Sequence, residues 1–425
     1  MKSKNILIFC ASMKKGGAER VISLLLKELE NERSIKVYFM MMENGIDYDL
    51  PKSITPIILS NSKKSGVQKL LELPFVALKL KKYIKENDID TVMSFLYRPN
   101  YINILAKIFG SNHKSIINIR STTSRYKNEG LLGKINLFLI NNLFDKANLI
   151  ISNSKGVDKD LKSLINITAN TKVIYNPVDI KYINSKKDIC EDVDFEFRED
   201  KKYIISVGRL IPLKRNIDLI TAFFELQKND DSLELIFLGD GILKDDLIND
   251  CVKLVIKDKV HFLGNVKNPF YYLAKSDLFV LNSEIEGFPN VLVEAMACRL
   301  PVISSDCKSG PREILEDEKY GLLYPVGDIS SLIEKMKFYL YENIKFMQNE
   351  LKELDIGSVQ PSIKVTHLVK VDFVKPDDEI LKKFDEQSSN YWRKIKVNQK
   401  QIQTLENLRD TLLPKLLSWE VRVEI

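Results

Sequence analysis

The strongest constraint on the fold is an alternation of short apolar segments with amphipathic, helix-like stretches, which occurs twice along the chain. Strands separated by helices pair in parallel, so each half predicts an open α/β sheet with helices on both faces. The two halves therefore predict two Rossmann-like domains. The expected strands are 6–9, 37–41, 91–95, 115–118, 147–152 and 173–175 in the first half, and 203–207, 235–238, 260–263, 278–281 and 302–304 in the second.

A polar, acidic stretch without clear periodicity separates the two halves, and its composition predicts a linker. A chain of 425 residues is long enough for two such domains, each with its own core. We therefore expect a first domain over 1–185, a linker over 186–202 and a second domain over 203–340. From residue 341 to 425 the character of the sequence changes, and we expect a helical tail there.

The composition, with 44% hydrophobic and 29% charged residues, is typical of a soluble globular protein. No apolar run reaches the roughly 18 residues that a membrane span needs, and the N-terminus lacks a signal-peptide pattern. The five cysteines have neither metal nor disulfide spacing, and the three histidines are not paired with other ligands at metal spacing. These features favour a cytoplasmic protein without a zinc site.

Two carboxylates, Glu286 and Glu294, lie eight residues apart in a segment that changes from loop to helix. The loop follows a buried strand, and Gly287 and Pro289 interrupt the chain before Asn290, which is expected to cap the helix. Amide N–H groups and the positive end of the helix dipole suit an anionic or hydroxyl-rich ligand. The plain alternative is a surface helix that carries two acids.

This run resembles the E-x7-E signature of retaining, nucleotide-sugar-dependent glycosyltransferases with the two-domain GT-B fold, which belong to family 4. The Glu-Gly-Phe-Pro-Asn segment between strand and helix, which includes Phe288, supports the resemblance. The resemblance implies that Glu286 lies near the donor sugar. It also implies that the amides from Gly287 to Asn290 contact the sugar hydroxyls and phosphate, and that Glu294 binds the ribose hydroxyls.

Further stretches over about residues 1–340 resemble the same family. Gly16 and Gly17 open a helix after the first strand, where backbone amides can approach a donor diphosphate, although a tight turn without ligand is the alternative. Gly208, Arg209 and Lys214 follow the first strand of the second half. The two cations can neutralise a leaving nucleoside diphosphate, or they are two exposed basic residues in a loop.

One stretch departs from the family pattern. Many relatives have a histidine at the end of a strand in the first domain, and here Arg120 stands at the matching place. Because arginine does not act as a base near neutral pH, Arg120 is expected to bind a phosphate instead. Arg98 adds a second cation in a loop that resembles another part of the family's cleft. Both arginines would suit a lipid-diphosphate acceptor, or they pair with surface acids.

No cofactor and no metal are expected. Two D-x-D triplets occur, one leading into a strand and one in the linker, and neither context suits a metal ion. In GT-B enzymes cationic side chains and helix dipoles serve where a divalent ion otherwise would, so the resemblance implies a metal-independent reaction.

The predicted function is transfer of a hexose or N-acetylhexosamine, with retention, from a nucleoside-diphosphate donor, expected to be a UDP-sugar. The acceptor would be a hydroxyl of a glycan or lipid-linked glycan in cell-surface polysaccharide or glycoconjugate biosynthesis. Lysines around 79–85 beside apolar residues 70–78, with a second amphipathic stretch at 131–140, predict peripheral contact with the inner face of the membrane, or a solvated helix face. A sugar-nucleotide epimerase of similar fold is one alternative.

The last 80 or so residues resemble the C-terminal helix of DNA-specificity subunits of type I restriction systems. The chain therefore resembles a chimera, and a DNA-recognition or restriction-complex component is a second alternative, with DNA binding itself unexpected because a full recognition domain is missing. The apolar stripe of the tail would allow self-association through a helix. Since the final helix of GT-B enzymes usually packs back on the first domain, we expect weak or no transfer until such a helix is restored.

Overall fold

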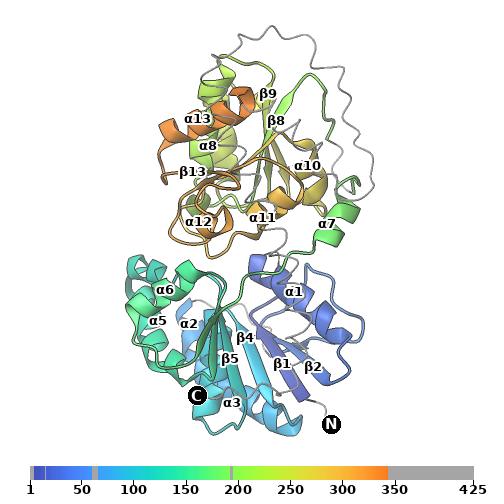
Figure 1. Ribbon diagram of the computed structural model, residues 1–425. Helices are drawn as coiled ribbons and strands as arrows, with labels where there is room; N and C mark the ends of the chain where they lie inside the picture. The colour runs from blue at the N-terminus through green and yellow to red at the C-terminus, as the bar shows by residue number, and fades with distance from the viewer. Residues whose placement is uncertain (1–3, 15, 60–65, 192–194, 343–425) are drawn as a thin grey trace. The chain divides into compact units, whose positions relative to one another are not determined.

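The computed structural model describes residues 4–14, 16–59, 66–191 and 195–342, and these residues form two open α/β sheets with their helices (Figure 1). Except for residues 341 and 342, the tail expected over 341–425 lies outside the described residues.

The first sheet has seven parallel strands in the order β3-β2-β1-β4-β5-β6-β7. Its strands are β1 Lys4–Cys10, β2 Ile35–Met41, β3 Ile57–Ile58, β4 Thr91–Phe95, β5 Lys114–Ile119, β6 Leu149–Ser152 and β7 Thr171–Val173. The helices of this half are α1 Gly17–Glu30, α2 Gly66–Leu71, α3 Leu73–Glu86, α4 Tyr97–Ile108, α5 Gly130–Leu143, α6 Lys155–Leu164 and α7 Ile180–Lys186, with 3-10 turns η1 Ser124–Asn128 and η2 Phe144–Lys146.

Helices cover both faces of the first sheet. One face packs against α1 through residues such as Ile22 and Leu26. The other face packs against α3, α4, α5 and α6, where Tyr101 and Phe144 are among the largest fully buried side chains. This arrangement explains why the strands are apolar on both faces, as parallel strands buried between two helix layers must be.

The second sheet has six parallel strands in the order β10-β9-β8-β11-β12-β13. Its strands are β8 Lys202–Val207, β9 Leu233–Leu238, β10 Val260–Gly264, β11 Leu278–Leu281, β12 Val302–Ser305 and β13 Leu322–Tyr324. The helices are α8 Asn216–Gln227, α9 Lys244–Lys253, α10 Pro269–Lys275, α11 Asn290–Ala297, α12 Pro311–Ile314 and α13 Ile329–Lys337, with the short turns η3 Pro212–Lys214, η4 Lys257–Lys259 and η5 Phe338–Glu342. Two cores flank this sheet, and the one that includes α10 and α11 also takes in Ile183 of α7 and the rings of Phe195 and Phe197.

The doubly wound α/β architecture expected from the alternation is confirmed. Two strands were not expected, β3 and β13, which have two and three residues and lie at sheet edges. The expected strand 173–175 instead ends at Val173 and begins at Thr171.

The strand order places a topological switch point in each sheet. In the first sheet the chain winds outward in both directions from β1 and β4, and in the second sheet from β8 and β11. Ligands of such sheets bind outside the carboxyl ends of the strands at this point. The segments singled out from the sequence leave the sheets at these ends: 16–17 follows β1, 120 follows β5, 208–214 follows β8 and 286–290 follows β11. Arg98 also follows β4, but its expected loop is wrong, because the chain turns directly into α4 and Arg98 is the second residue of that helix.

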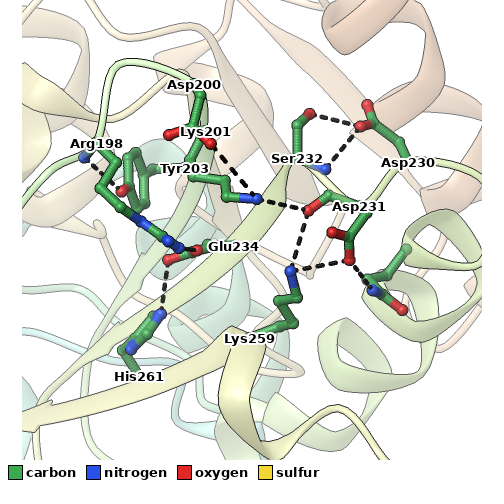
Figure 2. A network of polar contacts seen from close by, with 11 residues as sticks. Arg198, Asp200, Lys201, Tyr203, Asp230, Asp231, Ser232, Glu234, Lys259 and His261 are labelled. Atoms are coloured by element: carbon green, nitrogen blue, oxygen red, sulfur yellow. Dashed lines mark hydrogen bonds and ion pairs between the residues drawn. The ribbon is translucent and has the colours of Figure 1, made fainter.

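A polar network fixes the opposite end of the second sheet (Figure 2). Glu234, near the start of β9, accepts hydrogen bonds from Arg198 and, at 2.9 Å, shares one with His261 of β10. The Lys201 and Lys259 ammonium groups both donate to the Asp231 carbonyl, at 3.1 and 3.2 Å. Because these residues lie at the amino ends of β8, β9 and β10, the network anchors the end of the linker and stays away from the ligand-binding end.

Candidate functional site

The loop between β11 and α11 holds Glu286 against Lys214, which comes from the turn after β8. The Lys214 ammonium and the Glu286 carboxylate form a close ion pair, and their side chains are only 18% and 13% exposed. The two residues are 72 positions apart in sequence, and they meet because β8 and β11 are neighbours in the sheet. The acid and the cation singled out from the sequence therefore lie together at the switch point.

The glycine loop after β8 supports this pair. A methyl group on Gly208 would lie 3.6 Å from Lys214 Cε, so the lysine stem runs along this backbone. Gly239, after β9, has φ of +133°, and a Cβ there would lie 2.0 Å from the Gly208 carbonyl oxygen, so only glycine allows the two loops to pack. Arg209, which follows Gly208, is exposed to solvent.

The Glu286 loop is held in place through its backbone. The Ser309 hydroxyl donates a 2.6 Å hydrogen bond to the Glu286 carbonyl oxygen. A Cβ on Gly287 would lie 2.2 Å from the Arg120 carbonyl oxygen, so a larger residue at 287 would collide with backbone that has no room to yield. Pro289 packs against the loop after β12, since a Cβ on Gly310 would lie 2.7 Å from its Cδ.

Glu294 lies on the buried side of α11 and is only 6% exposed. Its carboxylate pairs with Arg20 of α1 at 3.0 Å, and the Arg20 guanidinium also lies 5.1 Å from the centre of the Phe270 ring. Burial raises the pKa of Glu294, and the positive charge of Arg20 counteracts part of that rise. Glu286 and Glu294 thus sit in different surroundings, one against a lysine in a loop and the other buried against an arginine.

Asn290 was expected to cap α11, and this was wrong. The N-cap is Pro289, and Asn290 is the first residue of the helix. Its side chain is occupied elsewhere: its Oδ1 accepts a 2.5 Å hydrogen bond from Asn176, and its Nδ2 donates to the Gly17 carbonyl at 3.2 Å. The same Asn176 nitrogen lies 3.5 Å from the Phe288 carbonyl oxygen. The glycine loop after β1 and the loop before α11 are therefore connected through Asn290.

The glycine loop after β1 is closed by a residue that the sequence did not single out. Gly16 is the N-cap of α1, and its amide and carbonyl both hydrogen-bond the Tyr48 hydroxyl, at 3.2 and 2.9 Å. The Glu19 carboxylate folds back over this loop, since a Cβ on Gly16 would lie 2.2 Å from Glu19 Oε2. Burial raises the pKa of Glu19, whereas its own amide N–H and the charges of Arg209 and Arg120 oppose the rise.

The two arginines of the first sheet differ in their surroundings. Arg98 forms an ion pair with Glu43 at 3.1 Å, which is the surface pairing considered as its alternative role. Arg120 lies above the Phe95 ring at 5.6 Å, and its Nε and Nη2 are buried without a hydrogen-bond partner among the described residues. Burial lowers the pKa of Arg120 to about 10, and the nearby Glu19 carboxylate opposes this. Arg120 is thus a buried cation with unused hydrogen-bond donors.

A second set of charged contacts near these loops was missed. Glu313 accepts hydrogen bonds from the Lys155 and Gly156 amides at the start of α6, at 2.8 and 2.6 Å. Lys308 forms a close ion pair with Asp160 of the same helix. One signal could have found them, because residues 308–313 follow the carboxyl end of β12, at the same edge of the sheet as Glu286.

Within the described ranges, no group of three or more histidine, cysteine, aspartate and glutamate residues is arranged to hold a metal ion. Two cationic side chains belong to this region: Lys214 is in contact with Glu286, and Arg209 lies on the same loop as Lys214.

Two Rossmann-like sheets, each with its charged loops at the carboxyl edge, define the GT-B fold of nucleotide-sugar-dependent glycosyltransferases. Solved structures share this fold. The protein HepE of Anabaena in complex with UDP superimposes with a TM-score of 0.62 at 20% identity, covering 81% of this chain and 91% of that one. Sucrose-phosphate synthase of Thermosynechococcus elongatus gives 0.67 at 16% identity, covering 80% and 90%.

Sequence comparison identifies the family. Residues 15–182 match the model "Glycosyltransferase Family 4", and residues 191–353 match "Glycosyl transferases group 1". A Campylobacter jejuni enzyme, N-acetylgalactosamine-N,N'-diacetylbacillosaminyl-diphospho-undecaprenol 4-alpha-N-acetylgalactosaminyltransferase, is 38% identical over 339 residues, which is 79% of this chain and 90% of the relative. An uncharacterized glycosyltransferase of Methanocaldococcus jannaschii is 33% identical over 308 residues, 68% of this chain and 72% of the relative.

The chain therefore belongs to glycosyltransferase family 4, and it is a glycosyltransferase of polysaccharide or glycoconjugate biosynthesis.

Proposed function

We propose that this protein transfers an N-acetylhexosamine or hexose from a UDP-sugar, with retention, to a hydroxyl of a lipid-linked glycan. The observation that carries the proposal is the contact of Glu286 with Lys214 at the switch point of the second sheet. The name of the Campylobacter jejuni relative supports the acceptor class, because it describes transfer of N-acetylgalactosamine to a glycan on diphospho-undecaprenol.

In the proposed reaction Lys214 and Arg209 stabilise the departing diphosphate. Transfer breaks the bond between the anomeric carbon and the phosphate oxygen, so negative charge grows on the phosphate as the bond lengthens. Cations fixed in advance at that place lower the barrier, because they need no rearrangement during the reaction. They also supply the charge that a divalent ion would otherwise provide, which supports a metal-independent reaction.

Glu286 is proposed to face the sugar. The anomeric centre becomes positive in the transition state, and a carboxylate nearby stabilises it. The ion pair with Lys214 keeps Glu286 in one position and links it to the diphosphate site. Glu294 is proposed to accept hydrogen bonds from the ribose hydroxyls, with Arg20 fixing its orientation. The amides of residues 287–290, together with the loops at Gly16, Gly17 and Gly208, would contact the remaining phosphate and hydroxyl oxygens.

Retention is proposed because the segment from Glu286 to Glu294 resembles the signature of retaining glycosyltransferases. A same-face transfer then accounts for the stereochemistry: the acceptor oxygen bonds to the anomeric carbon as the bond to the phosphate oxygen breaks, and the leaving phosphate takes up the proton of the acceptor hydroxyl. An alpha product, of the kind named for the Campylobacter jejuni relative, is the retained outcome when the donor carries an alpha-linked sugar.

Arg120 and Arg98 are proposed to meet the acceptor side. Arg120 has two buried guanidinium nitrogens without partners among the described residues, which suits a phosphate oxygen. Arg98 pairs with Glu43 through Nη1 and keeps a buried Nε without a partner among the same residues. A diphosphate-linked lipid carries the anionic group that both would bind.

A membrane-facing surface would bring such an acceptor within reach. Helices α2, α3 and α5 expose large apolar side chains, and lysines 79, 82, 85 and 134 on α3 and α5 are exposed as well. Apolar residues beside lysines favour contact with an anionic bilayer surface. Across the described residues, the helices are too short or too polar to cross a bilayer. The exposed apolar residues are Leu71, Phe75, Leu78, Leu131, Leu132 and Phe138.

The test is a donor panel with mass spectrometry of the product. The purified chain is incubated with a diphosphate-linked lipid glycan and, one at a time, with UDP- and GDP-linked hexoses and N-acetylhexosamines. We expect one sugar to be added from a UDP donor. Conversion of the donor sugar without any acceptor would instead favour the epimerase alternative. Neither that alternative nor the DNA-recognition alternative is supported by the relatives reported above.

A further inference from the structure

The start of α1 already lies against a negatively charged group of the protein itself, the carboxylate of Glu19. Glu19 is the third residue of the helix, and its carboxylate curls back to within contact distance of the Gly16 backbone. It is also held by its own amide N–H. Unpaired amides at a helix start attract phosphates and carboxylates alike. The carboxylate of Glu19 therefore occupies the position that the glycine loop offers to a ligand.

A second, independent feature of this place indicates that an outside ligand belongs there. Arg120 lies above Phe95 with its Nε and Nη2 atoms buried, yet these two nitrogens have no hydrogen-bond partner among the described residues. Burying a cation whose donors have no acceptor costs free energy unless a ligand supplies the missing hydrogen bonds. The Glu19 charge acts on Arg120 but leaves both nitrogens unpartnered, so the site is only partly satisfied.

The groups around Glu19 come from four elements. Arg120 follows β5 and Arg209 follows β8, and both charges act on Glu19. Cys10 at the end of β1 and Tyr48 after β2 face it as well, and the negative charge of Glu19 raises the pKa of each in addition to the larger effect of burial. The two cations are the only groups in this set that carry charge at neutral pH besides Glu19 itself.

We propose that Glu19 is a resident counter-anion of the diphosphate site formed by the α1 amides, Arg120 and Arg209, and that it competes with the phosphates of the donor. This inference rests on the proposed function, since it takes the ligand to be a nucleoside diphosphate. In the protein without ligand, the Glu19 carboxylate offsets the positive charge of Arg120 and Arg209. When a diphosphate binds, the negative charge of Glu19 must be neutralised or moved aside.

A simpler role is that Glu19 caps the helix. A glutamate at the third helical position commonly reaches back to the N-cap backbone. The change Glu19→Gln separates the two roles, because glutamine serves equally well in that cap and removes only the charge. Glu28→Gln on the exposed side of the same helix is the matched control, since it removes the same charge far from the glycine loop.

The experiment is isothermal titration of UDP, and separately of inorganic pyrophosphate, into the full-length wild type, Glu19→Gln and Glu28→Gln. Removing a like charge near the phosphates should tighten binding of both probes by about tenfold in Glu19→Gln and leave Glu28→Gln unchanged. Titrations in buffers of different ionisation enthalpy add a second readout. The wild type should take up more protons per bound UDP than Glu19→Gln, and its affinity should gain more as the pH falls, because a bound diphosphate favours the protonated acid.

Unchanged or weaker binding in Glu19→Gln, or equal proton uptake by the two proteins, would overturn the inference and assign Glu19 to helix capping or to orienting Arg120. Those results leave the proposed function standing, since the wild type still binds UDP. Failure of the wild type and of Glu19→Gln to bind either probe would overturn both.

Discussion

Replacing Glu286 with glutamine removes one negative charge and keeps the size of the side chain. In the structure this charge lies against Lys214, with both side chains largely shielded from water. Two unit charges about 3 Å apart attract by roughly 5 kcal/mol at an effective dielectric constant of about 20. Glu286 is proposed to attract the positive charge that develops on the sugar in the same way. Because that charge is partial and the site retains some solvent contact, we take about 3 kcal/mol as the transition-state stabilisation that the variant loses.

A loss of about 3 kcal/mol corresponds to a rate lower by about 10²-fold, and a range of about 10²–10³ is usual when one such electrostatic group is removed. The fold should suffer less. An uncompensated lysine that is partly exposed costs on the order of 1–2 kcal/mol of unfolding free energy, which lowers the melting temperature by a few degrees. Affinity for UDP should not fall, because Lys214 and Arg209 both remain and Lys214 loses the carboxylate that competes with the diphosphate for it.

The assay is transfer to a lipid-linked glycan under single-turnover conditions, with UDP affinity and thermal unfolding measured on the same preparations. Glu284→Gln is the matched control, since Glu284 lies two residues away in the same loop and is exposed. Transfer by Glu286→Gln within about twofold of the wild type would refute the reasoning. So would an equal loss in Glu284→Gln, which would trace the effect to the general charge of the loop.

Three further predictions follow from other parts of the structure. Glu294→Gln should weaken UDP binding by about tenfold in titration calorimetry. Burial raises the folded-state pKa of Glu294 above its ordinary value of 4.5. The stability of the wild type relative to this variant should therefore be highest below pH 4.5 and fall as the pH rises through the raised pKa. Equal pH profiles of the two proteins in thermal unfolding would contradict this. Replacing Phe75 and Phe138 with serine should lower co-sedimentation with anionic vesicles by about tenfold or more. Ile242→Ser, at an even more exposed apolar residue of the second domain, should not lower it, and equal losses would argue against a specific surface. Exchanging residues 341–425 for the C-terminal helix of a family relative should raise transfer, and full activity of the unchanged chain would show that no such helix is needed.

Most of the fold could be predicted because parallel strands buried on both faces are continuous apolar runs. The two strands that were missed, β3 and β13, are too short to stand out as runs and lie at the edges of their sheets. Strand β7 was displaced in the prediction, since Ile174 and Tyr175 are apolar but exposed beyond the last pairing. An apolar run predicts burial, but at the edge of a sheet an apolar residue can be exposed and lie outside the strand pairing.

The meeting of Glu286 with Lys214 could be expected, because both follow strands at one edge of the sheet and the family resemblance singled them out. The roles of Asn290 and Glu19 could not. Asn290 has the residue type of a helix cap, yet its side chain is taken up by Asn176 and by the Gly17 carbonyl, which only the folded chain brings near. Glu19 lies two residues after Gly17, but its position over Gly16 depends on a side-chain conformation that sequence spacing does not encode.

The central claim is that the chain transfers a sugar from UDP with retention, through a site that contains Glu286. The most direct test is the anomeric configuration, determined by NMR, of the product formed from an alpha-linked UDP-N-acetylhexosamine and a diphosphate-linked lipid glycan. The account predicts an alpha-linked sugar on the acceptor from the wild type and little or none from Glu286→Gln. A beta-linked product, or an alpha-linked product formed equally well by both proteins, would contradict it.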